Sequence, residues 1–526
     1  MPAIITDQFR ILNAETFTKS LTGIGTTSNF YYTFLAHPNP TNVSIEEYGT
    51  ATWSTTPPDP RDSFEQEDRY HDSMLFLKRI AINDVARIVP RIDWTSGITY
   101  DMYKNDYDIT NGAPQTSSKT LYESRFYIVN SEFKVYICIN NGSNPDNPDG
   151  QRSLIEPNFV DTVPQVAGNG SDGYLWKYLY TIPPSDIVKF TTENYMPLPA
   201  NWGDANTSNV KNAAVRGRIE TVNILTRGSG FSIANEGATG TVANVPILGN
   251  GTGGEVSVTI TGGEVTKVEV TSPGVNYTRG LINFDQTSAG SKTVTSGSGA
   301  SFEVIIPPKN GHGADIYREL GSYRIMVYSK YDADPDFVIG NTFSRVGLVR
   351  NPTEYGSSTA ILNTSTATNL GALKLTPTGI GVTSGIIYPV NAEIRQTVGA
   401  GQTAVGYVAS FNQNTGVLRY YQPVGLSTIA NNAFKQFDFA GIAAPITCTD
   451  AVFNSGSQSI LQPDITFAGS STNIGGKIID LGQTFTTGKA NPDVEKYSGD
   501  IIYIDNRAPI TRSSSQKEEV KIVVEF

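Results

Sequence analysis

The chain has 526 residues, enough for roughly three or four domains, and its 39 Lys and Arg against 50 Asp and Glu give a formal net charge of −11 at pH 7. Contacts to phosphates need clustered cations, so this acidic chain, which has no long basic run, predicts no nucleic-acid partner. Hydrophobic residues make up only 38%, while Gly (50), Pro (29), Tyr (26) and Phe (23) are abundant. Many turns together with β-prone aromatic residues favour a mainly β, multidomain fold.

Neither a leader nor a membrane segment is expected. Residues 1–4 show no basic stretch followed by an apolar one, and no run of about 18 apolar residues occurs, so we expect no signal peptide and no membrane insertion. The two cysteines, Cys138 and Cys448, lie far apart in the sequence. They predict buried free thiols and a reducing compartment or a redox-indifferent particle.

The N-terminal part predicts an extended arm, a short helix and an aromatic strand. The arm or strand covers residues 4–10 and the helix residues 13–21. The strand covers residues 30–35 and ends at His37-Pro38.

A second helix is the clearest one in the sequence. Ser63 and Gln66 have the spacing of a capping box, which predicts a helix from about residue 64 to the high seventies. Three apolar residues would share one face of it: Tyr70, Met74 and Leu77.

The next segment predicts an antiparallel pair of strands and a third strand with an aromatic row. Residues 126–129 and 133–139 form the pair, joined by a short turn at Asn130-Ser131. In the third strand, within residues 172–184, period two places four rings on one face: Tyr174, Trp176, Tyr178 and Tyr180. We favour a sheet core or a subunit contact for this row, although an exposed row could stack a sugar.

Residues 217–307 contain an internal repeat with an offset of 46 residues. Two sets of positions recur: Gly217, Ile219, Val222, Ile224, Gly228 and Phe231 as Gly263, Val265, Val268, Val270, Gly274 and Tyr277, and Gly251, Gly253, Val256, Val258 and Ile260 as Gly297, Gly299, Phe302, Val304 and Ile306. Alternating strands separated by glycines at one period predict a duplicated β domain whose halves pack on each other. Its ends, near Arg216 and Pro308, should lie close together.

The last third predicts one hairpin and two C-terminal strands. Residues 404–411 and 417–421 form the hairpin. Residues 501–504 are apolar on both faces and predict a buried strand, followed by a turn at residues 505–509. The final strand would bury one face, which carries Val520, Ile522, Val524 and Phe526. We expect these strands to pair with a sheet built by earlier residues, which makes the core discontinuous.

The sequence predicts no catalytic, cofactor-binding or metal-binding residues. The three histidines, His37, His71 and His312, lie in separate segments without metal-ligand spacing, and His312 between two glycines is expected to be a linker residue. No Gly-x-Ser-x-Gly motif and no phosphate-binding loop occurs. Residues 144–150 and 332–336 are rich in Asx; calcium is conceivable there, but Asx turns explain both stretches and are favoured.

Three stretches carry a family resemblance: Pro90-Arg91-Ile92-Asp93-Trp94, Asp172 to Pro184, and Gly499 to Ile510. They resemble elements of the dimeric baseplate wedge subunit, usually numbered eight, of T-even-type contractile-tail phages. Residues 323–327 and 343–352 continue the pattern, in the same order along the chain. The positions that match the signature are structural ones: Pro90, Arg91, Asp93, Trp94, Asp172, Gly173, Tyr174, Trp176, Pro183, Pro184, Asn506, Arg507 and Pro509.

The resemblance implies a mainly β protein with a β-sandwich-like core, few short helices and inserted small β domains. It divides the chain into a discontinuous core β domain (residues 1–110, 314–354 and 495–526), a second β domain (111–216), an inserted duplicated Gly-rich β domain (217–307) and an inserted Gly/Thr/Ser-rich β domain (355–494). The resemblance covers roughly a third of the chain, and neither insert is part of it.

The function implied by the resemblance is mechanical. Such a subunit is a virion protein without enzymatic activity or cofactor, assembled in the host cytoplasm. It forms a homodimer within each of six wedges, contacts other wedge proteins, and holds its neighbours during assembly and tail contraction. Two alternatives remain open: a receptor- or carbohydrate-binding tail protein that uses the inserted domains, and a tail-associated glycan hydrolase, which would need two carboxylates about 5–10 Å apart in a cleft.

Overall fold

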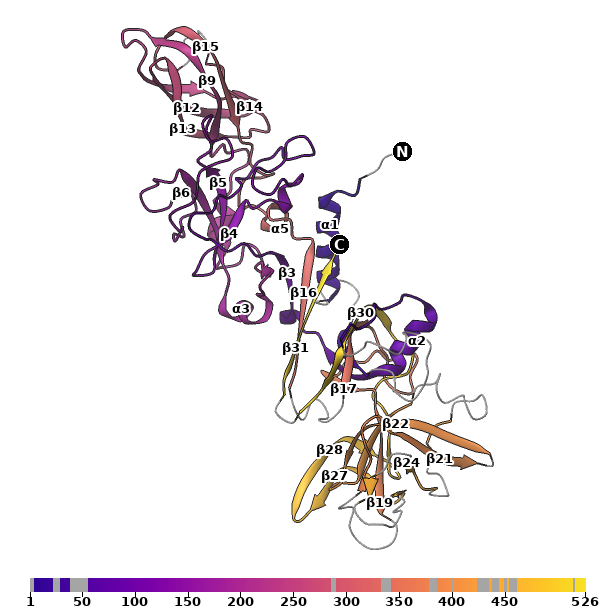
Figure 1. Cartoon of the computed structure of the whole chain (residues 1–526). Helices are drawn as coiled ribbons and strands as arrows, with labels where there is room; N and C mark the ends of the chain where they lie inside the picture. The colour runs from indigo at the N-terminus through magenta and orange to yellow at the C-terminus, as the bar shows by residue number, and fades with distance from the viewer. Residues whose placement is uncertain are drawn as a thin grey trace. The chain divides into compact units, whose positions relative to one another are not determined.

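The computed structural model describes residues 4–21, 29–37, 55–284, 290–332, 342–377, 386–399, 401–422, 435–437, 444–448, 452–453, 461–513 and 516–526 (Figure 1). Two compact units are present, each assembled from separate stretches of chain. The first comprises Met1–Thr18, Ala86–Met326 and Val523–Phe526, and the second Lys19–Val85 and Val327–Ile522. Strands far outnumber the short helices, which confirms the mainly β class. The four predicted domain boundaries and the sandwich arrangement stay predictions.

The described helices are few, and the longest, α1, has 15 residues. Two 3₁₀ turns accompany them, η1 (Ile82–Asp84) and η2 (Leu121–Glu123). The α-helices are α1 (Asp7–Leu21), α2 (Phe64–Ser73), α3 (Pro184–Phe190), α4 (Ser208–Asn212) and α5 (Ile316–Glu319).

One sheet of the first unit holds its aromatic core. Its strands run in the order β4-β5-β7-β6: β4 (Tyr127–Val129), β5 (Lys134–Asn141), β7 (Tyr174–Thr181) and β6 (Gln165–Val166). The antiparallel pair β4–β5 confirms the predicted hairpin, and β5 continues antiparallel to β7. The strands are buried because Tyr136, Ile137 and Trp176 face a shared core.

The strands of the repeat enclose an apolar core of their own within the first unit. Its strands are β9 (Val222–Ile233), β10 (Gly240–Pro246), β11 (Leu248–Gly249), β12 (Thr252–Thr261), β13 (Glu264–Val275), β14 (Gly280–Leu281) and β15 (Val294–Val304). The sheets are β10-β12-β13, β15-β9 and β11-β14 (Figure 1). Residues of both halves line one apolar core, including Val258, Ile260 and Val294.

The two halves of the repeat domain exchange strands. Strand β9 of the first half pairs with β15 of the second, and β12 of the first pairs with β13 of the second. Val222 lies opposite Val304, which confirms that the ends of the insert lie close together.

The two halves also exchange side-chain contacts at their glycines. A Cβ at Gly297 would lie 2.3 Å from the Phe231 ring, and one at Gly251 would lie 2.4 Å from the Tyr277 ring. Because each glycine belongs to the opposite half from the ring that it touches, the predicted packing of the halves is confirmed.

A five-stranded sheet in the second unit gathers distant parts of the chain. Its order is β18-β2-β1-β17-β30: β18 (Thr366–Thr368), β2 (Met74–Arg79), β1 (Tyr31–Ala36), β17 (Thr342–Arg350) and β30 (Asp500–Thr511). Strand β1 is buried along its whole length. Pairing of β30 with β17 confirms that the C-terminal stretch joins strands formed by earlier residues.

The remaining strands of the second unit surround the predicted hairpin, which is confirmed as β22 (Gln402–Asn412) with β23 (Val417–Tyr421). They lie in the sheet β24-β21-β22-β23-β19-β26, with β29 against β19, and in the pairs β20-β25 and β27-β28. Their bounds are β19 (Gly371–Pro377), β20 (Ile386–Ile387), β21 (Glu393–Gly399), β24 (Thr447–Cys448), β25 (Val452–Phe453), β26 (Leu461–Pro463), β27 (Gly469–Ile474), β28 (Lys477–Phe485) and β29 (Lys489–Ala490).

A further sheet has the order β31-β16-β3-β8, with β31 (Glu518–Glu525), β16 (Arg324–Tyr331), β3 (Val85–Pro90) and β8 (Tyr195–Pro197). In β31, Ile522 is buried, whereas Val520, Val524 and Phe526 are half-buried. The predicted apolar face of this strand is therefore less covered than expected, because β31 lies at the edge of its sheet.

Two predicted N-terminal elements are wrong in their bounds. The first helix begins at Asp7 rather than residue 13, because Thr6 accepts the amide of Phe9 with its carbonyl (2.9 Å) and an acidic residue suits the first turn. The second helix ends at Ser73, and Met74 and Leu77 belong to strand β2 instead of a helical face. Pairing of β2 with β1 overrides the helical spacing of these apolar residues.

The predicted turn at residues 505–509 is also wrong, because β30 continues through it. Phe343 pairs with Ile510 and Arg345 with Asn506, so three residues of β30 lie opposite one residue of β17. Pro509 falls inside this bulge at a sheet edge, where its missing N–H costs no ladder bond. The edge position also leaves Ile502 39% exposed, so residues 501–504 are not buried on both faces as predicted.

Candidate functional site

The three stretches that resemble the wedge family are called signature stretches: residues 90–94, 172–184 and 499–510. The second of them begins at a buried carboxylate, Asp172, which accepts hydrogen bonds from the backbone around it. Asp172 is 4% exposed. Its Oδ2 accepts the amides of Leu154 (2.9 Å) and Ile155 (3.3 Å), and its Oδ1 accepts the amide of Tyr174 (3.2 Å). A charged acceptor with three backbone donors fixes the start of β7 against the segment that precedes it. Gly173, with φ of +76°, turns the chain between the two.

Tyr100 connects this stretch to the first signature stretch. The hydroxyl of Tyr174 donates to the carbonyl of Gln151 (2.8 Å) and accepts the amide of Tyr100 (2.9 Å). In turn, the hydroxyl of Tyr100 donates to the carbonyl of Asp93 (3.2 Å) and accepts the amide of Thr95 (2.6 Å). Burial raises the pKa of both phenols, so these hydroxyls stay neutral donors.

The Pro-Arg-Ile-Asp-Trp stretch is tied to the same sheet. The backbone of Asp93 bridges Val129 at the end of β4, and the amide of Trp94 donates to the Val129 carbonyl (2.9 Å). The indole N–H of Trp94 donates to the hydroxyl of Ser153 (3.0 Å). Arg91 pairs with Asp93 at 2.9 Å, and the carbonyl of Pro90 accepts the hydroxyl of Tyr127 (2.8 Å). The structure thus brings two of the three signature stretches together.

The aromatic row of β7 belongs to the core of the sheet. Tyr174 and Trp176 stack with ring centroids 5.1 Å apart, and both are fully buried. A bulge at Leu179 turns Tyr178 out of strict alternation, and its hydroxyl bonds to that of Thr181 (2.8 Å). Tyr174, Trp176 and Tyr180 are buried and Tyr178 is half-buried, so for three of the four rings the sheet-core interpretation is confirmed, while the subunit contact stays a prediction.

The two signature prolines form a helix start. Pro183 precedes α3 and accepts the amides of Asp186 and Ile187 with its carbonyl, both at 3.0 Å. Pro184 takes the first helical position, where its missing N–H is not needed.

The third signature stretch lies in the second unit and surrounds a buried arginine. Asn506 accepts Nε of Arg345 at 3.0 Å with its side-chain oxygen and donates to the carbonyl of Pro58 at 2.8 Å. The guanidinium of Arg345 also reaches the hydroxyl of Ser73 (3.3 Å) and lies over the ring of Tyr70. Arg507 is exposed and pairs with Asp505, so of the three matched positions in this stretch Asn506 is the buried one.

The histidines do not converge on a reaction centre. His312 is buried rather than a linker residue, and its Nδ1 lies 2.6 Å from a carboxylate oxygen of Glu319. His37 stacks on Tyr421, with ring centroids 4.7 Å apart. Burial lowers the pKa of His71 from its usual value of 6.5. Within the described residues, no group of three His, Cys, Asp or Glu side chains could hold a metal ion.

The two Asx-rich stretches differ in what the structure describes. In residues 144–150, the side-chain oxygen of Asn144 accepts the amides of Asp146 (3.0 Å) and Asn147 (3.1 Å), which is the favoured Asx turn. Of the second stretch, residues 333–336 lie outside the described residues.

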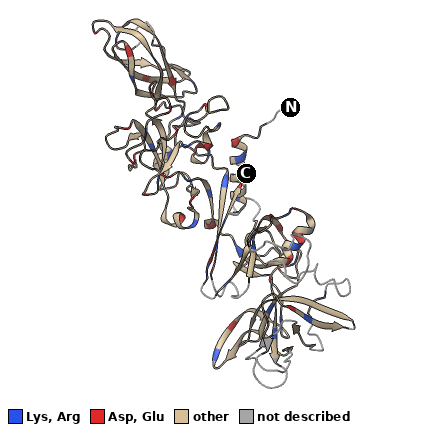
Figure 2. Ribbon diagram, in the orientation of Figure 1, with Lys and Arg blue, Asp and Glu red and all other residues tan. Residues whose placement is uncertain are grey.

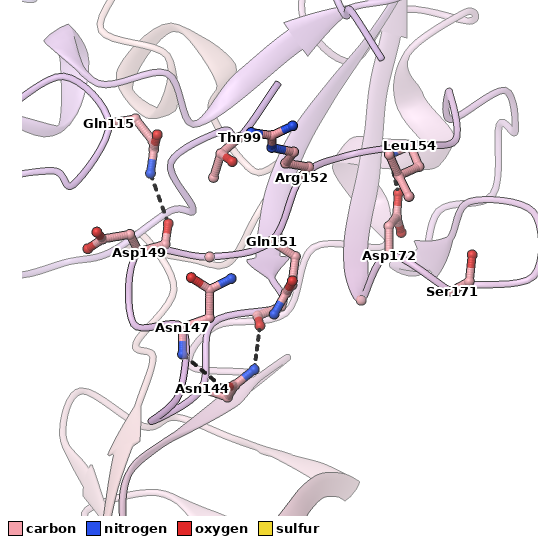
Figure 3. A pocket seen from close by; sticks show the side chains of 13 residues that line it. Thr99, Gln115, Asn144, Asn147, Asp149, Gln151, Arg152, Leu154, Ser171 and Asp172 are labelled. Atoms are coloured by element: carbon pink, nitrogen blue, oxygen red, sulfur yellow. Dashed lines mark hydrogen bonds between the residues drawn. The ribbon is translucent and has the colours of Figure 1, made fainter. Parts of the chain in front are cut away.

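A polar pocket opens beside the second signature stretch and was not predicted from the sequence. Its volume is about 720 Å³, and its lining includes Asn147, Gln151, Arg152 and Asp172 (Figure 3). In the sequence, the Asx-rich stretch at residues 144–150 marks part of its lining. Tyr100 and Arg345 were missed as well, because nothing local marks a tyrosine or an arginine that pairs with residues far along the chain.

Charges of both signs are interspersed, with acidic residues in excess over the whole chain. Figure 2 shows Lys and Arg interspersed with Asp and Glu over the described elements. In that part of the chain, each helix is too short or too polar to cross a bilayer.

Comparison with known proteins gives one weak but consistent similarity. The chain is 25% identical over 223 residues to "Baseplate wedge protein gp8" of Enterobacteria phage T4. The match covers 38% of this chain and 60% of that protein's length. No known protein-family profile matches the sequence. This similarity supports a distant relationship to a wedge subunit and a structural role in a phage baseplate, in a virion tail.

Proposed function

We propose that this chain is a baseplate wedge subunit of a contractile phage tail, a structural virion protein without enzymatic activity. It holds neighbouring wedge proteins in place during assembly in the host cytoplasm and during tail contraction. Its partners are a second copy of itself and other wedge proteins. The observation that carries the proposal is the similarity to the T4 wedge protein over 223 residues.

The use of the signature side chains supports a mechanical role. The polar side-chain atoms of Asp172, Tyr174 and Trp94 form hydrogen bonds with the backbone or side chains of their own unit. Asn506 does the same in the second unit by holding the buried Arg345. Side chains used in this way make a rigid framework, as an assembly part requires, and leave no reactive group exposed among them.

The first test is the mass of the purified protein in solution. We expect a dimer, twice the chain mass of 56.8 kDa, that persists on dilution, because a permanent two-fold interface buries on the order of 2,000 Å². A dilution-independent monomer would overturn the dimer.

The second test locates the protein. Antibody labelling of purified tails in the electron microscope should mark the baseplate with six-fold symmetry. Label on tail fibres alone, together with a monomeric mass, would instead favour the receptor-binding alternative.

A further inference from the structure

The polar pocket beside Asp172 has the size of a ligand site. About 720 Å³ falls within the roughly 300–1,000 Å³ of small-molecule sites. Figure 3 shows side chains from the 144–154 segment, from Thr99 and Gln115, and from Ser171 and Asp172 around it. The pocket belongs to the first unit and lies outside both predicted inserts.

The pocket walls are held in place before any ligand arrives. The Asn144 Asx turn fixes one wall, and the side-chain amide of Gln115 donates to the carbonyl of Asp149 (3.0 Å). At the other end, Asp172 holds the amide of Leu154 (2.9 Å). A ligand therefore meets preformed walls, which reduces the ordering cost of binding.

Four backbone amides of the pocket wall already have hydrogen-bond acceptors. The amides of Gly142, Gly150, Gln151 and Ser171 donate to Asn140, Asn147, Asn141 and Asn169, respectively. An added strand would need free backbone donors, and these four amides offer none.

Five side chains retain their hydrogen-bonding capacity. Within the described residues, the side chains of Thr99, Asn147, Gln151, Arg152 and Ser171 have no hydrogen-bond partner, although all five line the pocket. Thr99, Asn147 and Gln151 are half-buried, and Arg152 and Ser171 are exposed. Hydroxyl and amide groups of this kind both donate and accept.

The charge and shape of the lining select the ligand class. Beside these neutral groups stand one guanidinium, Arg152, and one exposed carboxylate, Asp149, while the Asp172 carboxylate is already engaged. This balance disfavours a phosphate, which needs several cations, and a metal ion, which needs clustered carboxylates. Leu154 is the only large apolar side chain in the lining, so the pocket lacks the apolar surface on which a hydrophobic anchor residue of a partner protein would pack.

We propose that this pocket binds a neutral saccharide. Vicinal hydroxyl groups donate and accept at close spacing, and they match the amides of Asn147 and Gln151 and the guanidinium of Arg152. No aromatic ring lines the pocket, so affinity comes from hydrogen bonds alone and is expected to be millimolar. The site is independent of the proposed structural function, and it differs from a receptor site on the inserted domains.

The test is saturation-transfer NMR on the full-length protein with a panel of neutral hexoses and N-acetylhexosamines, and with inorganic phosphate as a charged probe. We expect transfer to at least one neutral sugar and none to phosphate. Titration should then give about fivefold weaker binding for Gln151→Ala and about tenfold for Arg152→Ala, since each loses one hydrogen-bond partner. Arg279→Ala is the matched control, because Arg279 is exposed in the repeat domain, away from the pocket lining.

The outcomes separate cleanly. Binding weakened by about these factors in the two pocket variants, with the control unchanged and with the same circular dichroism spectrum in all three variants, supports the site. Absence of transfer from every sugar, equal binding by wild type and pocket variants, or binding of phosphate instead overturns it. None of these results bears on the dimer or on the location in the tail, so failure here leaves the proposed function standing.

Discussion

Replacing Gly297 by alanine tests how the two halves of the repeat domain hold together. The new Cβ would lie 2.3 Å from Cδ1 and 2.6 Å from Cα of Phe231, and φ at this position is +112°. The unfavourable backbone conformation costs about 1–3 kcal/mol, and displacing a buried ring costs about 1–3 kcal/mol more. We therefore expect Gly297→Ala to lower the free energy of local unfolding in this domain by about 2–6 kcal/mol.

Hydrogen exchange measured by mass spectrometry on the full-length chain is the suitable assay, because a multidomain protein does not unfold in two states. Peptides from β9 and β15 should exchange about thirtyfold faster or more, at a tenfold change per roughly 1.4 kcal/mol. Gly262→Ala is the control: its φ is +63°, and no heavy atom lies within 4 Å of an added Cβ. It should cost only about 1–2 kcal/mol. Equal exchange in the two variants would show that the Phe231 contact does not hold the halves.

Three further outcomes are expected. Val222 lies opposite Val304, so a short Gly-Ser linker in place of residues 217–307 can join the two ends. We expect the shortened chain to stay folded and dimeric, as measured by its melting profile and its mass. Aggregation or a monomeric mass would show that the repeat belongs to the body of the protein. Deleting residues 520–526 removes the buried Ile522 and its half-buried apolar neighbours, whose burial stabilises the fold by roughly 4–6 kcal/mol together. The shortened chain should therefore be insoluble, and a soluble, cooperatively melting truncation would contradict this. The pKa of the buried His71 lies below its usual value of 6.5, so below that pH the unfolded state binds more protons than the folded state. The free energy of unfolding should therefore fall as the pH is lowered from neutral to about 5. The melting temperature of His71→Gln should depend less on pH, and an unchanged pH dependence would exclude this histidine as the cause.

The sequence predicted local pairings better than long-range ones. Turn residues and alternating apolar residues mark the hairpins β4–β5 and β22–β23, and both are present. The 46-residue period likewise predicted a duplicated domain, but periodicity shows which segments are alike and not which of them pair. The exchange of β9 with β15 therefore became visible only in the structure.

Errors arose where one apolar run suits two structures. Met74 to Leu77 fits a helical face, but all four residues are buried, and strand β1 supplies the partner that decides the outcome. Pro509 marks a turn in isolation, whereas a sheet edge with a bulge also accepts it.

Predicting the candidate site was limited in the same way. The signature residues were found as a pattern, yet the bonds through Tyr100 join positions more than 70 residues apart, since its amide donates to Tyr174. The pocket depends on side chains without partners in the described structure, and a sequence does not show which side chains lack partners.

The exchange of strands between the two repeats has a consequence for how this gene segment can change. If a deletion removed one repeat, the surviving copy would keep strands whose pairing partners lay in the lost one. Because β12 has in the first copy the place that β15 has in the second, such a product would have to pair β9 with its own β12 or recruit a strand from another polypeptide. We therefore expect that loss of one copy demands a new strand pairing before the segment can fold, whereas loss of both copies together leaves none of these strands without its partner.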